Sequence, residues 1–426
     1  MEPCRKKENK IKTENIKDPW VSSGKNTNRY RWVILAILWI TFIVVFLVRL
    51  SVGPLGPFFK EDLNLSSAQV GLVLSIAAFG YLLTQIPVGW IADRIGARWP
   101  IALGEIIAGC AMISLYFVSS YGMFMALIFL TGMGCGFLAP STTQAVIVWF
   151  PKRERATIMG FKQTAVNIGG IIGAATLPAV AVAMGWRFGF FILGIIAISI
   201  GIISFLFYKN PPDLSYSICQ KRKDPFAIVP LKAIIRNTEI WKVAMGIFFL
   251  NWIEMAMIGH FVIYLNKALL FPVVAAGGLL AISETAGAIA RPVSGLVSDR
   301  IFYGRRKPVF IFFAATASVM CLLLAVFGIR LSWGIYPVIF VLGIGAIGFG
   351  GIALTLLSEL GGKGGAAKAA ALGNSIGMGG SILGPPLFGY IVDITGSYPT
   401  AWLSLAIVGI ICVFTLISVK ESERKI

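Results

Sequence analysis

Two arginines lie inside long apolar stretches of the sequence, where a charged side chain is costly and usually has a function. Arg49 belongs to the stretch 32–57 and is followed by several glycines and prolines, and Arg291 lies two turns inside the stretch 272–298. A planar guanidinium group can donate two parallel hydrogen bonds to a carboxylate or to nitrate. We therefore predict that both arginines bind a small anion. The alternatives are that Arg49 extends to the surface of an apolar layer and that Arg291 forms an ion pair that only stabilises the fold.

Two carboxyl groups accompany these arginines in the apolar stretches. Glu254 lies near the middle of the stretch 240–265, and Glu284 precedes Arg291 by seven residues, which places both on one face of a helix. Away from water a carboxyl group favours its neutral form, so it can take up and release a proton. We predict that Glu254 and Glu284 are proton-coupling groups. Further polar residues expected to line the site are Gln85, Asn167, Asn374 and Tyr264. The sequence assigns no role to Glu105, Lys162 or His260.

Several classes of function are disfavoured by what the sequence lacks. It contains a single histidine and six scattered cysteines without a CxxC pair, so neither a multi-histidine metal site nor a disulfide framework is expected. It has no GxxxxGK phosphate-binding loop and no candidate catalytic triad. We therefore expect neither an enzyme nor an ATP-driven pump, and no cofactor or metal.

The composition indicates that the solvent of this chain is lipid. Of its 426 residues, 57% are hydrophobic and only 13% are charged, which is far outside the range of soluble domains. Apolar runs of about 20 residues are long enough to cross a bilayer as helices. We predict an all-α membrane protein with twelve transmembrane helices in two six-helix pseudo-repeated bundles. The predicted helices are 32–57, 68–92, 99–119, 122–148, 155–184, 187–208, 240–265, 272–298, 307–328, 333–359, 366–394 and 399–419.

The distribution of charged residues predicts where the chain divides into bundles and tails, and on which side of the membrane its termini lie. The polar segment 209–239 separates an N-terminal bundle, 32–208, from a C-terminal bundle, 240–419, and tails of 1–31 and 420–426 flank them. If both termini are cytoplasmic, most of the 37 Lys and Arg residues fall on the cytoplasmic side, as the positive-inside rule requires. The net charge of +18 is then explained by topology and by anionic lipid. A nucleic-acid partner is not expected.

A short charged motif occurs twice, once after the second apolar stretch and once after the eighth. Asn167 and Asn374, in the fifth and eleventh stretches, are also each followed by two glycines and a proline at identical offsets. Such duplicated bundles are typical of secondary transporters. We predict that the motif is a conformational switch that latches the two halves in one state and releases them in the other. Its residues are Gly89, Asp93, Arg94, Gly96 and Arg98 in the first copy, and Gly295, Asp299 and Arg300 in the second.

The motif Gly-x3-Asp-Arg-x-Gly-x-Arg and its second copy resemble the signature of the major facilitator superfamily, and the resemblance covers essentially the whole chain. The segment from Arg49 to Gly71, with Tyr81 and Gln85 beyond it, resembles the anion:cation symporter branch. That resemblance implies that Arg49 contacts an organic anion. The branch usually carries an acidic residue two places before a proline of the fourth helix. Leu138 stands there in this chain, so Glu254 or another group would have to replace that residue.

Other residues resemble neighbouring branches of the same superfamily. Ala290-Arg291-Pro292 resembles both monocarboxylate and nitrate/nitrite transporters, in which the arginine of the eighth helix grips the anion. Nitrate carriers keep a second arginine in the second helix, where Gln85 stands in this chain. What these branches share is an anionic substrate.

The sequence thus predicts a secondary active transporter that moves a small organic anion, a carboxylate or a sugar acid, by alternating access. A proton or another ion is expected to be coupled to this movement. A nitrate/nitrite porter and, less favoured, a drug-efflux pump are the alternatives. We expect a monomer that crosses a bacterial inner membrane many times, with both termini in the cytoplasm.

Overall fold

The computed structural model describes residues 25–151, 154–210, 231–327, 334–362 and 364–421. In these residues twelve helical spans are long and apolar enough to cross a membrane, which confirms the predicted fold class. The first six spans are α3 (Lys25–Leu50) with α4 (Val52–Asp62), α5 (Ser67–Ile95), α6 (Arg98–Ser114) with η1 (Leu115–Phe117), α7 (Tyr121–Gly136) with α8 (Leu138–Trp149), α9 (Arg155–Met184) and α10 (Trp186–Phe207).

The second six spans follow a short helix, α12 (Leu231–Arg236). They are α13 (Thr238–Lys267), α14 (Val273–Arg300), α15 (Lys307–Phe327), α16 (Ile335–Ile347) with α17 (Gly350–Gly361), α18 (Ala366–Thr395) and α19 (Tyr398–Ile417). Most of the predicted central segment, and the outermost residues of both predicted tails, lie outside the described residues. α3 begins within the predicted N-terminal tail.

Three spans that the sequence predicts as continuous helices are interrupted. The first breaks at Ser51, the fourth at Phe137 and the tenth at Gly348–Phe349. At Ser51 the side-chain hydroxyl donates to the Val48 carbonyl at 2.7 Å. Near the fourth-span break, Thr84 of α5 donates a hydrogen bond of 3.0 Å to the Met133 carbonyl. Side-chain donors at such breaks can replace backbone hydrogen bonds that the bilayer cannot supply.

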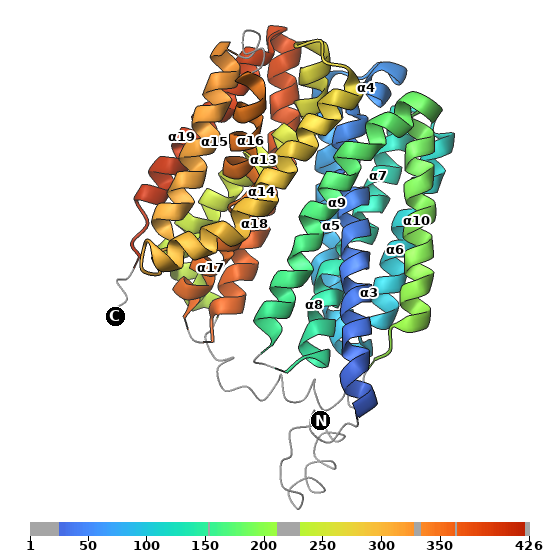
Figure 1. Ribbon diagram of the computed structural model, residues 1–426, viewed down its shortest axis with the longest axis vertical. Coiled ribbons are helices and arrows are strands. Elements are labelled where there is room, and N and C mark those ends of the chain that lie inside the picture. Colours follow the sequence, from blue (N-terminus) through green and yellow to red (C-terminus); the bar gives the residue numbers. More distant parts are fainter. Residues whose placement is uncertain (1–24, 152–153, 211–230, 328–333, 363, 422–426) are drawn as a thin grey trace, which may run out of the picture.

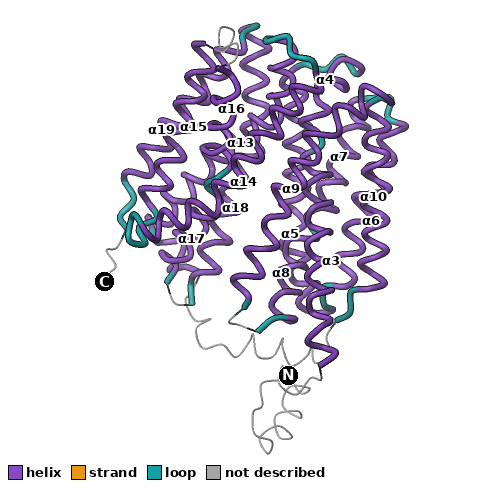
Figure 2. The backbone as a smooth tube through the Cα atoms, in the orientation of Figure 1, coloured by secondary structure: helices purple, strands orange, loops and turns teal. Residues whose placement is uncertain are grey.

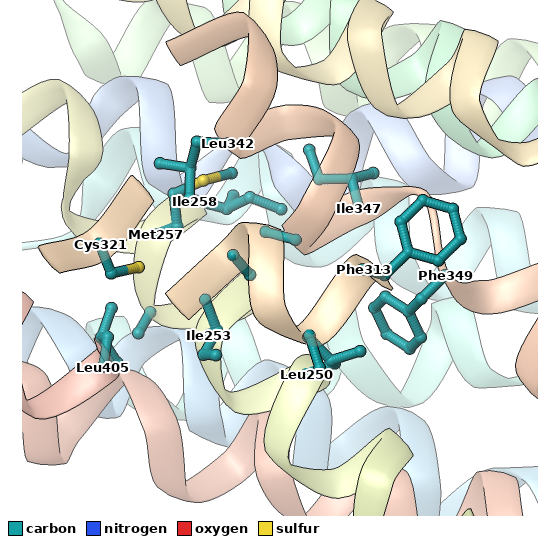
Figure 3. Packing of buried hydrophobic residues seen from close by; sticks show 14 of the residues in the cluster. Leu250, Ile253, Met257, Ile258, Phe313, Cys321, Leu342, Ile347, Phe349 and Leu405 are labelled. Carbon is teal, nitrogen blue, oxygen red and sulfur yellow. The ribbon is translucent and has the colours of Figure 1, made fainter. Parts of the chain in front are cut away.

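The helices form two bundles, blue to green and yellow to red in Figure 1, built by the same pairings. α3 packs on α9, α5 on α7 and α6 on α10, and correspondingly α13 packs on α18, α14 on α16 and α15 on α19. Each bundle has its own apolar core. Figure 3 shows part of the core of the C-terminal bundle, to which Met257 of α13, Phe313 of α15 and Leu342 of α16 contribute.

The two bundles contact each other through α5 with α18, α9 with α14 and α4 with α13. The close approach depends on glycine: a Cβ atom at Gly71 of α5 would lie 2.3 Å from the Pro385 carbonyl oxygen of α18. Ser75 of α5 also donates to the Ile382 carbonyl of α18. Lys267 of α13 pairs with Glu61 of α4.

These contacts gather at the end of the molecule where α4 and the start of α5 lie, opposite the start of α3 and the end of α19 (Figure 1). The backbone tube in Figure 2 shows that the bundles diverge from this end toward the end where α3 begins and α19 ends. The structure is therefore closed between the bundles at one end.

Candidate functional site

Arg49 lies in the last turn of α3, directly before the break at Ser51. Its guanidinium carbon lies 4.3 Å from the centre of the Tyr81 ring of α5 and 5.7 Å from the centre of the Phe46 ring. One terminal nitrogen is 4.0 Å from the Met378 sulfur of α18, in the other bundle. Among the described residues no carboxylate forms an ion pair with Arg49. A cation without a counter-charge at the bundle interface can bind an anion.

Arg291 lies on α14, in the C-terminal bundle, and contacts the backbone where the tenth span is interrupted. Its Nε donates to the carbonyl of Ile347, the last residue of α16, at 3.2 Å. The side chain is partly exposed, and within the described part of the chain it forms no ion pair. A bond through Nε fixes the plane of the guanidinium group, which leaves its outer edge of two terminal nitrogens as the anion-binding edge.

Glu254 of α13 and Glu284 of α14 are both buried. The charge of Arg291 acts on both carboxyl groups, and that of Arg49 acts on Glu254. The Glu284 carboxyl lies against α9 of the opposite bundle, because a Cβ atom at Gly170 would be 2.9 Å from its carboxyl carbon. Arg49 and Glu284 therefore reach the bundle interface, and the four predicted charged groups form one electrostatic unit.

The polar neighbours predicted from sequence are distributed around this unit. Gln85 lies one turn after Tyr81 on α5, and the Tyr81 ring stacks on Arg49. Asn167 is buried one turn before Gly170 on α9, and its side-chain oxygen has no hydrogen-bond partner among the described residues. Asn374 is exposed, one turn before Met378 on α18.

Tyr264 has different surroundings from the other predicted polar neighbours. It is only 1% exposed, and its ring lies 5.5 Å from Tyr398 and 5.3 Å from Trp402, between ring centres. These residues belong to the aromatic packing of α13 against α19. Tyr264 therefore packs inside the C-terminal bundle, and no described contact joins it to either arginine.

Sequence reasoning missed the contact residues of Arg49, among them Tyr81 and Met378. Tyr81 could have been found, because it precedes Gln85 by four residues and so lies on the same face of α5. Met378 carries no polar signal, and its contact with Arg49 depends on how α18 packs against the first bundle.

The first copy of the switch motif lies where α5 ends and α6 begins. Arg98 donates to the Phe205 carbonyl at 2.8 Å and covers the Phe205 ring at 4.5 Å, so it joins α6 to α10. Gly96 adopts a positive φ of 85°. Asp93 is half-buried and Arg94 is exposed. Gly89 lies near Pro140 of α8.

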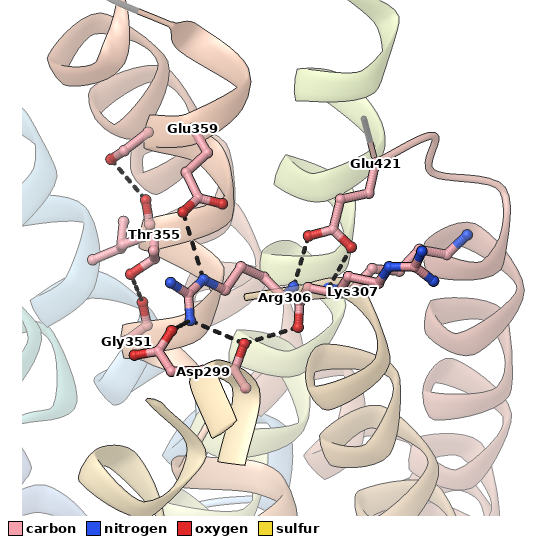
Figure 4. A network of polar contacts seen from close by, with 11 residues as sticks. Asp299, Arg306, Lys307, Gly351, Thr355, Glu359 and Glu421 are labelled. Atoms are coloured by element: carbon pink, nitrogen blue, oxygen red, sulfur yellow. Dashed lines mark hydrogen bonds and ion pairs between the residues drawn. The ribbon is translucent and has the colours of Figure 1, made fainter. Parts of the chain in front are cut away.

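The second copy forms a polar network that Figure 4 shows. Arg306 pairs with Asp299 at 2.5 Å and with Glu359 of α17 at 3.6 Å. The Arg306 backbone N–H donates to the Glu421 carboxylate at 2.6 Å. All of these segments belong to the C-terminal bundle, so in this conformation Asp299 joins parts of one half. Gly295 and the exposed Arg300 lie outside the network. A latch between the two halves stays a prediction.

Two polar residues without an assigned role have local partners. Lys162 is 3% exposed, donates to the Thr142 and Thr143 hydroxyls at 3.0 and 3.4 Å, and lies 4.3 Å over the Phe42 ring. His260 contacts the Pro385 carbonyl through Nε2 at 2.9 Å, with its ring stacked on Phe388. Each of these side chains therefore contacts residues of its own bundle.

Comparison with known proteins agrees with this architecture. A probable sulfoacetate transporter of Cupriavidus necator is 24% identical over 91% of this chain and 93% of its own length. The hexuronate transporter of Bacillus subtilis is 26% identical over 92% of this chain and 94% of its own. A crystal structure of a bacterial homolog of the human lysosomal transporter Spinster, inward-facing and occupied, superposes with a TM-score of 0.78 and 16% identity, covering 91% and 96% of the two chains.

The family profile of the Major Facilitator Superfamily matches residues 38–385. This match takes in eleven of the twelve apolar spans in whole or part, from α3 to the middle of α18. The chain is a multi-pass membrane protein and a member of the major facilitator superfamily.

Proposed function

We propose that this protein is a secondary active transporter of small organic anions, coupled to protons and working by alternating access. The observation that carries the proposal is a pair of arginines without ion-pair partners in the described part of the chain, one in each bundle. Arg49 and Arg291 belong to different bundles, and neither forms an ion pair among the described residues. Two guanidinium groups that approach from two sides can hold one carboxylate or sulfonate group, or the two ends of a longer acid.

The names of the relatives support the substrate class. Sulfoacetate and hexuronates are small organic acids, and transporters named for them match most of this chain. Alternating access is supported by the contact pattern, because the bundles meet at one end and diverge toward the other (Figure 1). With the termini in the cytoplasm of a bacterial cell, the diverging end faces inward. We assign residues 32–208 and 240–419 to the two moving bundles.

Proton coupling is supported by electrostatics at the same site. Glu254 lies in the field of Arg49 and Arg291, and Glu284 in that of Arg291. An anion bound between the arginines cancels part of this positive field, and a carboxyl group nearby then gains affinity for a proton. By thermodynamic reciprocity a bound proton raises the affinity for the anion to the same degree. The anion and the proton therefore bind together, as symport requires.

The test uses purified protein in liposomes with the outside more acidic than the inside. Uptake of lactate, oxalate, gluconate, glucuronate, sulfoacetate, nitrate and nitrite is compared for the wild type, Arg49→Gln and Arg291→Gln. The expected result is uptake of one or more organic acids that each substitution reduces by about 100-fold, since a lost charged hydrogen-bond pair costs several kcal/mol.

Arg187→Gln is the matched control for these substitutions. This arginine is partly exposed at the start of α10 and pairs with Asp62 at 2.7 Å, so its loss should leave uptake unchanged. Uptake of nitrate alone would replace the organic-acid assignment by a nitrate porter. Organic-acid uptake that survives in both site variants would reject the arginine pair as the anion site.

A further inference from the structure

The helices α5 and α18 meet, across the two bundles, along rows of residues that start at the closed end of the molecule. One turn into α5, a Cβ atom at Gly71 would lie 2.3 Å from the Pro385 carbonyl oxygen of α18. One turn further from the closed end, the Ser75 hydroxyl donates to the Ile382 carbonyl. Pro385 and Ile382 are three residues apart, so they lie on one face of α18. This face of α18 is therefore the one that covers the first bundle.

Met378 is the next residue of the same face, one turn beyond Ile382. Its side chain is 6% exposed and packs in the apolar cluster of the N-terminal bundle, although α18 belongs to the C-terminal bundle. Its sulfur lies 4.0 Å from a terminal nitrogen of Arg49. Asn374, a further turn along this face, is exposed. The closed part of the interface between α18 and the first bundle therefore ends at Met378.

This position places a thioether against a terminal nitrogen of Arg49, the group proposed above to bind the anion. A methionine sulfur is a weak acceptor without charge, so it does not replace a counter-ion of the guanidinium group. Tyr81 and Phe46 cover the guanidinium carbon from within the N-terminal bundle. A carboxylate or sulfonate that binds this nitrogen therefore lies against Met378 or displaces it. Methionine suits such a place because its unbranched chain has three rotatable bonds and adapts to surfaces of different shape.

We propose that Met378 is a specificity-determining residue, which selects acids by the size of the group attached to their anionic head. The inference rests on the proposed function. An acid whose head binds Arg49 places the next atoms of its carbon skeleton against Met378. A small acid such as lactate leaves the methionine close to its present position, whereas the ring of glucuronate requires the side chain to adopt another rotamer. The size of the side chain at this position thus sets the ratio in which small and bulky acids bind.

The variant Met378→Ala tests this inference, because it removes the side chain beyond Cβ and leaves both arginines in place. Lactate and glucuronate compete with uptake of the labelled organic acid that the wild-type protein moves into liposomes, and the ratio of their inhibition constants is measured. A change of one or a few carbon atoms in a pocket alters discrimination by about tenfold or more. We expect the ratio to shift about tenfold in favour of glucuronate. In Met378→Leu, which keeps a similar volume, the ratio should stay close to that of the wild type.

Met257→Ala is the matched control, because Met257 is buried in the core of the C-terminal bundle (Figure 3). Its loss should lower stability without changing the ratio. Met378→Val makes a smaller reduction in size and should shift the ratio in the same direction as alanine, so it replaces Met378→Ala as the test if the alanine variant does not fold.

An unchanged ratio in the smaller variants would overturn the inference and leave the proposed function intact. Weaker competition by both acids to the same degree would also overturn it, since that result indicates a structural role. So would an equal shift in Met378→Leu, because size would then not be the cause. If the wild-type protein moves no organic anion, the proposed function fails, and this inference fails with it.

Discussion

The carboxylate of Asp393 accepts a hydrogen bond from the backbone N–H of Ser67 across the two bundles. Asp393 is in the last turn of α18 and Ser67 is the first residue of α5, and the bond is 2.8 Å long. The second carboxylate oxygen accepts from the Ala68 N–H, also at 2.8 Å. One bundle thus supplies a negative charge to the positive end of a helix of the other, which stabilises that end. Lys60 adds a bond of 2.7 Å to the Ser67 hydroxyl.

Replacing Asp393 by alanine should weaken the closed end of the molecule. Hydrogen bonds to a charged group contribute about 1.5–3 kcal/mol, and because Asp393 is exposed solvent reduces this to about 1 kcal/mol, roughly fivefold in population. Distance measurements between spin labels on α4 and α13 should show a larger fraction of molecules with this end open. Asp62→Ala, whose partner Arg187 lies in the same bundle, serves as the control. Identical distance distributions in the two variants would contradict this role of Asp393.

Substitution of Arg49 by lysine should weaken anion binding although the charge is kept. Lysine lacks the planar fork that binds a carboxylate through two parallel bonds and that stacks on the Tyr81 ring. We expect the KM for uptake to rise about tenfold, since roughly 1.4 kcal/mol corresponds to that factor. Tyr81→Phe keeps the ring and should change KM much less than Tyr81→Ala. Equal KM values for Arg49→Lys and the wild type would show that only the charge matters.

A methyl group at Gly170 should disturb Glu284. The added Cβ atom would lie 2.9 Å from the Glu284 carboxyl carbon and from one of its oxygens, so the carboxyl group must move away from α9. Initial uptake rates of Gly170→Ala should fall about tenfold or more, since displacements of this size are costly at a transport site. Gly160→Ala lies on the same helix with open space around the new atom. Uptake reduced equally by both substitutions would point to the helix backbone as the cause.

The polar network of the second motif copy should contribute to stability. The side chain of Arg306 is only 11% exposed and pairs with both Asp299 and Glu359. Removing a partly buried arginine leaves two carboxylates without their cation, so Arg306→Ala should lose about 2–3 kcal/mol of unfolding free energy. Thermal unfolding in detergent measures this as a lower Tm. Arg300→Ala, at an exposed position, should change Tm little. An equal Tm for both variants would show that the network is dispensable.

The positions of the spans could be predicted from the sequence because lipid demands long apolar helices whatever their packing. The same argument located Arg49, Arg291, Glu254 and Glu284, since charges in apolar stretches are visible in any one sequence. Helical periodicity shows which residues share a face of one helix, but it does not show which neighbour they meet.

Features that depend on neighbouring helices were therefore missed. The packing of Tyr264 among the aromatic rings of α19 is one such feature, and its role as a substrate contact stays a prediction. The hydrogen bonds of Asp393 to α5 and of Arg291 to Ile347 join segments far apart in the sequence. Asp393 itself lies near the end of a predicted helix, where a carboxylate is common and gives no signal.

The bond from Arg291 to Ile347 fixes this arginine to its own bundle, whereas Arg49 is carried by the other. The two arginines therefore belong to different bundles, and any rotation of one bundle against the other changes the distance between their guanidinium groups. If an anion occupies the space between the arginines, its negative charge attracts both of them. The bound anion then stabilises the contact between the bundles during the conformational change. An empty carrier would have to bring two like charges together without that anion. This repulsion would discourage the unloaded protein from cycling and so limit leakage of the gradient that drives uptake.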